Sequence, residues 1–109
     1  MQITIQARSF SLTGALSNYV KRRLGFALSN HGEHIQHIMV RLSDINGPRG
    51  GKDKQCQLLV LLDQLPDVFI EDIEADMYVA IDRAADRAGR TVGRRISRQR
   101  DMLRTVAFS

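Results

Sequence analysis

The feature that most constrains the fold is a long amphipathic segment that runs from about Met77 to Leu103. When residues are placed at about 100° per residue around a helix axis, its apolar side chains fall within one sector about 120° wide. These side chains are Ile81, Ala84, Ala85, Ala88, Val92, Ile96 and Leu103. Asp76 precedes them as a candidate N-cap. One apolar stripe requires one other layer to cover it, so the segment predicts a long helix packed on a sheet.

The rest of the chain supplies that sheet. Alternating or apolar patterns predict strands over residues 2–7, 35–43, 55–62 and 68–75. Ser11 and Thr13 are candidate N-caps of an earlier helix that ends at about Leu28. The order predicts a two-layer α+β domain, β-α-β-β-β-α, with a four-stranded sheet and both helices packed on one face. The last three strands follow one another directly, so we expect them to pair antiparallel.

Length and cysteine content narrow the class of protein further. The chain has 109 residues, and we expect a single domain over residues 1–104 with a short C-terminal tail at 105–109. One cysteine, Cys56, excludes an internal disulfide framework, and its place in an apolar strand predicts a buried thiol. The longest apolar run, residues 58–62, is far shorter than the ~20 residues of a membrane span. No signal peptide is recognisable, and we therefore expect a cytoplasmic domain without membrane contact.

Charge is strongly segregated although the formal net charge is only +4. Residues 63–86 carry eight acidic side chains and one basic, whereas residues 87–109 carry seven basic and one acidic. Five arginines of the long helix fall within a sector about 80° wide, almost opposite the apolar stripe. They are Arg83, Arg87, Arg90, Arg94 and Arg98.

This arginine row does not stabilise the helix that carries it. Arginines three or four residues apart repel one another by roughly 0.2–0.5 kcal/mol per pair. Gly89 and Gly93 each weaken the helix interior by roughly 1 kcal/mol relative to alanine. Successive arginines rise by about 4.5–6 Å along the axis, close to the spacing of phosphates in a nucleic-acid strand. The row is therefore better explained as a site for an external polyanion.

A second basic cluster lies on the first predicted helix, at Lys21, Arg22 and Arg23. At least two of these three consecutive residues face outward whatever the rotation of the helix. Arg49, Lys52 and Lys54 in a glycine-rich loop add to the same charge. Together these groups predict a composite RNA-binding surface.

Both helices also carry recognisable motifs. The second contains Asp76-Met77-Tyr78-Val79-Ala80-Ile81-Asp82, followed by Asp86-Arg87 and Arg90. The first contains Thr13-Gly14-Ala15-Leu16, leading to Tyr19-Val20-Lys21-Arg22-Arg23-Leu24. Over about residues 1–100 the chain resembles the short ribosome hibernation-promoting factors, also described as ribosome-associated inhibitor or ribosomal subunit interface proteins.

The resemblance implies a domain that binds the small ribosomal subunit between its head and body. It implies contact with rRNA in the channel where mRNA and tRNAs would sit, through the basic residues that match the family: Arg23, Arg87, Arg90, Arg94 and Arg98. Translation by idle ribosomes would be blocked by occlusion under stress or in stationary phase. The resemblance implies no cofactor and no small-molecule substrate. It also implies a protein that is monomeric when it is not bound to the ribosome.

Two other binding functions remain open at this point, and an enzyme is disfavoured. A general double-stranded RNA or DNA binder could use the same arginines, and a protein-interaction module could use the acidic residues 63–86. No pair of carboxylates is marked as acid and base. His31, His34 and His37 lack the spacing of a metal site, so we expect no metal. Six aromatic residues, mostly at core-like positions, leave no stacking platform for single-stranded bases.

Overall fold

The computed structural model describes residues 1–45 and 51–108, with side chains up to Arg104. Its elements are β1 (Gln2–Arg8), α1 (Gly14–Ala27), a short 3-10 helix η1 (Ser29–His34), β2 (Ile35–Asp44), β3 (Lys54–Leu62), β4 (Val68–Glu74) and α2 (Met77–Phe108). This order confirms the predicted β-α-β-β-β-α arrangement. The predicted strands agree to within a residue or so at each end, whereas α2 continues to Phe108 instead of ending at about Leu103.

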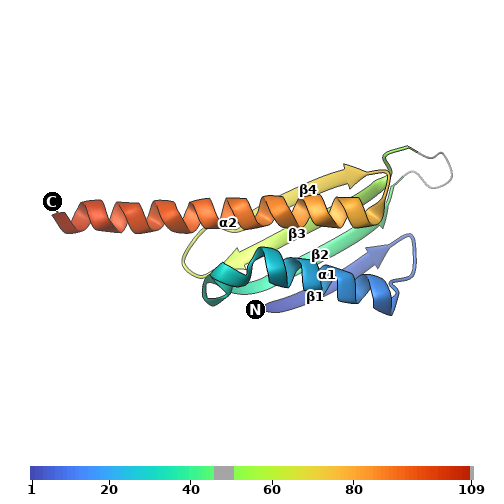
Figure 1. Cartoon of the computed structure of the whole chain (residues 1–109), viewed down its shortest axis with the longest axis horizontal. Helices are drawn as coiled ribbons and strands as arrows, with labels where there is room; N and C mark the ends of the chain where they lie inside the picture. Colours follow the sequence, from blue (N-terminus) through green and yellow to red (C-terminus); the bar gives the residue numbers. More distant parts are fainter. Residues whose placement is uncertain (46–50, 109) are drawn as a thin grey trace.

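The four strands form one sheet in the order β1-β2-β3-β4. β2 pairs antiparallel with β3, and β3 pairs antiparallel with β4, as expected from direct connections. β1 pairs parallel with β2, with Ile3 opposite Ile38 and Ile5 opposite Val40. A parallel pair needs a crossover connection, and here α1 provides it. Both helices lie on the same side of the sheet, side by side (Figure 1).

The core lies between this sheet face and the two helices. On β2, Ile38, Val40 and Leu42 alternate inward, and on β3 Leu58 and Val60 do the same. The two helices pack against these strands; their buried residues, among the side chains described, are Leu16, Val20, Leu24, Ala80, Ile81, Ala84, Ala85, Ala88, Val92 and Ile96. Cys56 is fully buried, as predicted.

One member of the predicted apolar stripe does not pack on the sheet. The expectation for Leu103 was wrong, because this side chain is 65% exposed. Up to Arg104, Ile96 is the last buried residue of α2, and the C-terminal part of the helix extends past the end of the sheet (Figure 1). No helix in residues 1–45 and 51–108 is both long and apolar enough to cross a membrane.

Side-chain hydrogen bonds fix the first residues of α1 and α2 and join α2 to the sheet. The Thr13 hydroxyl accepts the Leu16 N–H at 3.1 Å, so Thr13, and not Ser11, is the N-cap of α1. A carboxylate oxygen of Asp76 accepts the Tyr78 N–H at 2.8 Å at the start of α2, which confirms the predicted cap. Arg95, which the helical projection places at the edge of the apolar sector, donates to the backbone carbonyls of Pro66 and Asp67 at 2.7 and 2.8 Å. It ties α2 to the β3–β4 turn.

The two interior glycines of α2 allow close packing of the helix on its neighbours. A Cβ at Gly89 would lie 2.7 Å from the backbone oxygen of Ala27, at the end of α1. A Cβ at Gly93 would lie 3.2 Å from Nε2 of His31 in η1. Their cost in helix propensity is therefore offset by an approach that a larger residue would prevent.

The expectation that the aromatic residues lie mostly in the core was wrong. Phe26 and Phe69 are well exposed, Tyr78 is exposed, and Phe10 and Tyr19 are only partly buried. Tyr19 and Tyr78 form an edge-to-face pair across the two helices, with ring centroids 4.8 Å apart.

Candidate nucleic-acid interface

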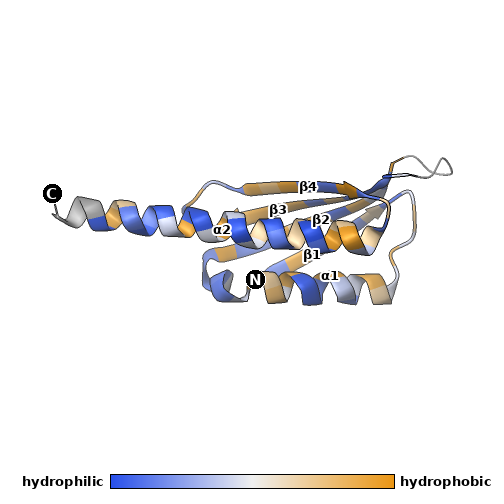
Figure 2. Ribbon diagram, turned by 45° about the horizontal axis from the view of Figure 1, so that its top comes forward, coloured by the Kyte–Doolittle hydropathy of each residue, from blue (hydrophilic) through white to orange (hydrophobic). Residues whose placement is uncertain are grey.

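The five arginines of the row are all exposed along α2, opposite the buried stripe. In Figure 2 hydrophilic and hydrophobic residues alternate along α2, as expected of a helix with one packed side. The arginines are not equivalent, however, because their surroundings change along the helix. The first two lie beside the acidic end of β4, and the last three do not.

Arg83 and Arg87 face carboxylates of the chain itself. Nε of Arg83 lies 3.8 Å from Glu74, and Nη1 of Arg87 lies 3.8 Å from Asp72. The same Nη1 donates a 2.6 Å hydrogen bond to the backbone oxygen of Glu71. The acidic segment that follows β3 in sequence therefore neutralises part of the row.

Asp72 and Glu74 lie next to these arginines and are hydrogen-bonded to each other. Both side chains project from β4 towards α2 and are largely buried. Burial raises the pKa of Asp72, and its hydrogen bond with Glu74 acts in the same direction. That hydrogen bond lowers the pKa of Glu74. The two carboxyls thus favour holding a single negative charge between them.

Arg90, Arg94 and Arg98 differ from the first two. Within the described residues, Arg90 and Arg98 have no hydrogen bond or ion pair, and Arg94 has only a 3.5 Å contact with the Thr91 hydroxyl. They line an open groove of about 550 Å³ between α2 and η1. The other lining residues are His31, Gly89, Gly93, Ser97 and Asp101. This C-terminal half of the row is the part with charge available for a ligand.

The cluster on α1 divides in a similar way. Lys21 and Arg22 are exposed, which confirms that at least two of the three face outward. The guanidinium of Arg22 lies over the Tyr19 ring, 5.6 Å from its centroid. Arg23 instead turns towards α2, and its side chain is only 22% exposed.

Arg23 connects the two helices. Its Nε donates to Asp82 at 2.8 Å, and its Nη2 donates to Asp86 at 3.0 Å. The Tyr19 hydroxyl donates to the same Asp82 oxygen at 2.5 Å. Partial burial works to lower the pKa of Arg23, but the two carboxylates outweigh it and raise the pKa above its usual value. The implied RNA contact at Arg23 is therefore already occupied by the chain's own acids.

The remaining predicted basic groups contribute little. Lys52 is exposed. Lys54 forms ion pairs with Asp44 at 2.9 Å and with Asp53 at 3.3 Å, so its charge is less available to an RNA phosphate. Arg49 and the glycine-rich turn at residues 46–50 lie outside the described residues.

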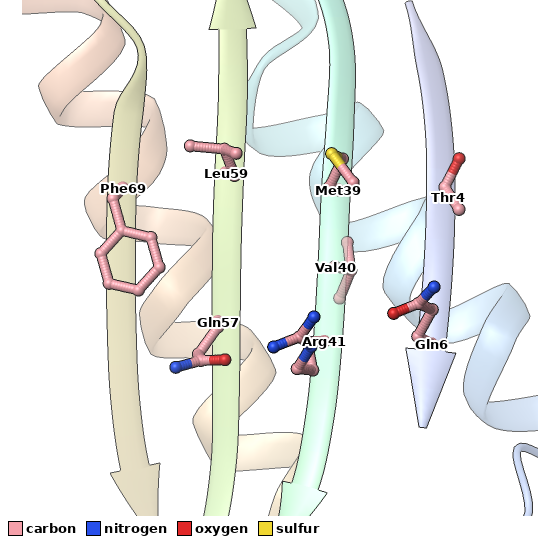
Figure 3. Close-up of a pocket in the computed structure, with 8 residues that line it drawn as sticks. All are labelled: Thr4, Gln6, Met39, Val40, Arg41, Gln57, Leu59 and Phe69. Carbon is pink, nitrogen blue, oxygen red and sulfur yellow. The ribbon is translucent and has the colours of Figure 1, made fainter. Parts of the chain in front are cut away.

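The sheet face opposite the helices holds a second, smaller pocket of about 180 Å³. Figure 3 shows its lining side chains, which come from all four strands: Thr4, Gln6, Met39, Val40, Arg41, Gln57, Leu59 and Phe69. Among these lining residues Arg41 is the one cation, and Gln57 is hydrogen-bonded to Glu71. The lining of this pocket therefore has little of the positive charge that attracts a polyanion.

The helical projection of α2 does not reveal that His31 belongs to the interface. From the sequence, His31 is considered only as a metal ligand, and no metal is expected there; within the described residues no group of histidines, cysteines and carboxylates could hold a metal. Nothing in its own sequence context places His31 against α2. The four-residue spacing of Gly89 and Gly93 was the available signal, because glycines at that spacing lie on one side of a helix.

Comparisons with known proteins agree with this architecture. The family model described as Sigma 54 modulation protein / S30EA ribosomal protein matches residues 3–100. The Protein Y N-terminal domain from Thermus thermophilus is 30% identical, with a TM-score of 0.68 over 85% of this chain and 93% of that one. A ribosomal subunit interface protein from Coxiella burnetii shares the fold at 18% identity, with a TM-score of 0.74 over 86% and 96%. No curated protein matched the sequence.

Proposed function

The chain belongs to the Sigma 54 modulation protein / S30EA ribosomal protein family, and from this membership we propose that it binds the small ribosomal subunit and keeps idle ribosomes out of translation. The family is one of ribosome-binding proteins without enzymatic activity. The protein would act in the cytoplasm as a monomer that needs no cofactor, and under stress or in stationary phase.

The observation that carries the proposal is the set of arginines for which the described part of the chain provides no ion pair. Arg90, Arg94 and Arg98 project from one side of α2 at intervals of about 6 Å along the axis. Guanidinium groups bind phosphate oxygens with paired hydrogen bonds, so such a series suits the backbone of an RNA strand. Lys21 and Arg22 extend the positive surface onto α1.

The other arginines have supporting parts in this proposal. Arg83 and Arg87 lie at the border of the surface and share their charge with Asp72 and Glu74. Arg23 holds α1 against α2 and so fixes the spacing between the two basic clusters. We propose that occlusion of the mRNA and tRNA channel, rather than any chemistry, stops translation.

The structure makes one alternative weaker. A protein-interaction module would need the acidic segment 63–86 to face a basic partner. Four of its acids already bind arginines of the chain: Asp72, Glu74, Asp82 and Asp86. The segment therefore has much less free negative charge than its sequence suggests.

Co-sedimentation with purified small subunits tests the proposal. Arg90→Ala/Arg94→Ala is compared with Arg8→Ala/Arg41→Ala, which removes the same charge from exposed positions on the other face of the sheet. Only the first pair is expected to weaken binding. It should also reduce the slope of log K against log salt by roughly 0.7–0.9 for each phosphate that the variant no longer binds.

Two results would contradict the proposal. Equal loss of affinity with both double variants would indicate nonspecific attraction to positive charge. Displacement from subunits by a modest excess of duplex RNA would indicate a general double-stranded RNA binder.

A further inference from the structure

The groove between η1 and α2 has a second wall that the arginine row does not explain. His31 lies on η1, and its imidazole packs against α2 where Gly93 has no side chain. Its backbone N–H donates to the Leu28 carbonyl at 3.0 Å, which forms the first turn of η1 directly after α1. The imidazole therefore lines the same groove as Arg90 and Arg94, beside Gly93.

Resting on the proposed function, we propose that this groove seats the phosphodiester backbone of one rRNA strand and that His31 is a phosphate-contacting residue within it. Arg90, Arg94 and Arg98 form one wall, the His31 imidazole the other, and Ser97 adds a hydroxyl donor. Gly89 and Gly93 also line the groove; the Cβ position of Gly89 faces the Ala27 carbonyl and that of Gly93 faces His31, so larger residues there would disturb the packing of α2 on α1 and η1.

The charges around the groove favour this occupant. Three arginines line it, and the only carboxylate among its described lining residues is Asp101, one turn beyond Arg98. A carboxylate repels phosphate, so the part that binds anions spans Arg90 to Arg98 and ends at Asp101. A volume of about 550 Å³ that is open along the helix suits an extended chain better than an enclosed small molecule.

Gly93 is predicted to act through His31. A Cβ at position 93 would lie 3.2 Å from the imidazole Nε2, closer than ordinary van der Waals contact, so the ring must shift by a few tenths of an ångström. In a chain without the imidazole the added methyl group meets nothing of His31. Gly93→Ala and His31→Ala should therefore be non-additive, as expected of residues in direct contact.

The experiment measures affinity for small ribosomal subunits and for their rRNA stripped of protein. His31→Ala is expected to weaken both by roughly three- to tenfold, the effect of one hydrogen bond to phosphate. Gly93→Ala should weaken binding in the same direction, and the double variant should bind no worse than His31→Ala. His34→Ala is the matched control, because His34 lies on the same 3-10 helix but does not line the groove. Urea unfolding of each variant checks that the fold is retained.

The outcomes separate this inference from the function on which it rests. If His31→Ala binds subunits like the unmodified protein while Arg90→Ala/Arg94→Ala does not, the phosphate contact of His31 is refuted and the proposed function stands. A loss of affinity for subunits but not for protein-free rRNA would also refute it, because the groove would then face a ribosomal protein. If neither variant affects binding, the proposed function fails as well.

Discussion

Gly89→Ala is expected to destabilise the domain, although alanine is normally the better helix former. In a helix interior the exchange of glycine for alanine gains about 1 kcal/mol. Here the added Cβ would lie 2.7 Å from the Ala27 oxygen and 3.5 Å from its carbonyl carbon. Both are backbone atoms at the end of α1, so the two helices must separate.

The size of the effect follows from these opposing terms. Forcing an extra methyl group into a closely packed contact costs about 1–3 kcal/mol, and a backbone contact this short lies at the upper end. We therefore expect a net loss of about 1–2 kcal/mol, which lowers the Tm by roughly 4–10 °C in a domain of this size.

Thermal and urea unfolding followed by circular dichroism measure the change. Gly25→Ala is the matched control, since no atom lies within 4 Å of its added Cβ and the residue is inside α1. That variant should gain roughly 0.5–1 kcal/mol from reduced freedom of the unfolded chain. If Gly89→Ala were as stable as Gly25→Ala, the close approach of α2 to the end of α1 would be wrong.

Three further predictions concern polar and titratable groups. Asp82→Ala removes the carboxylate that binds Arg23 and should cost about 1–2 kcal/mol in urea unfolding, a value reduced for partial exposure; an unchanged midpoint would contradict this role. Burial raises the pKa of Cys56 to about 12, so the thiol should resist iodoacetamide at pH 8 in the folded protein and react on unfolding, as mass spectrometry would show. The pKa of Asp72 is raised in the folded protein, so ionisation of this carboxyl opposes folding above that pKa. Asp72→Asn should therefore be more stable than the unmodified protein at pH 7. The difference in stability should shrink in acid, where Asp72 itself becomes protonated. Equal unfolding midpoints for the two proteins at pH 7 would contradict that assignment.

Most of the fold could be predicted because its signals are local. Alternation marks which side of β2 and β3 is buried, and the caps Thr13 and Asp76 mark where the helices begin. The parallel pairing of β1 with β2 has no comparable local signal, since it depends on the path that α1 takes over the sheet. Likewise, helical periodicity shows which side of α2 is apolar but not how far the sheet beneath it extends. Leu103 was misplaced for that reason.

The sequence predicted which side of α2 carries the arginines, but not which of these arginines are paired with the chain's own carboxylates. A helical projection places Arg83 and Arg98 in the same row, yet only Arg83 lies beside the acidic end of β4. Arg23 was expected to contact RNA, and nothing near it in sequence reveals that Asp82, 59 residues away, occupies its guanidinium. Which charges are free depends on contacts distant in sequence, and these became evident only in three dimensions.

The overhang of α2 has a dynamic consequence. Past Ile96 the described side chains have no sheet beneath them, so the backbone amides there depend on the helix's own ladder, which frays from a free end. Hydrogen exchange should therefore accelerate turn by turn from Ser97 towards Arg104. Arg98 lies near the start of this segment, and an anion bound there would slow the hydrogen exchange of the backbone amides in the turns that follow.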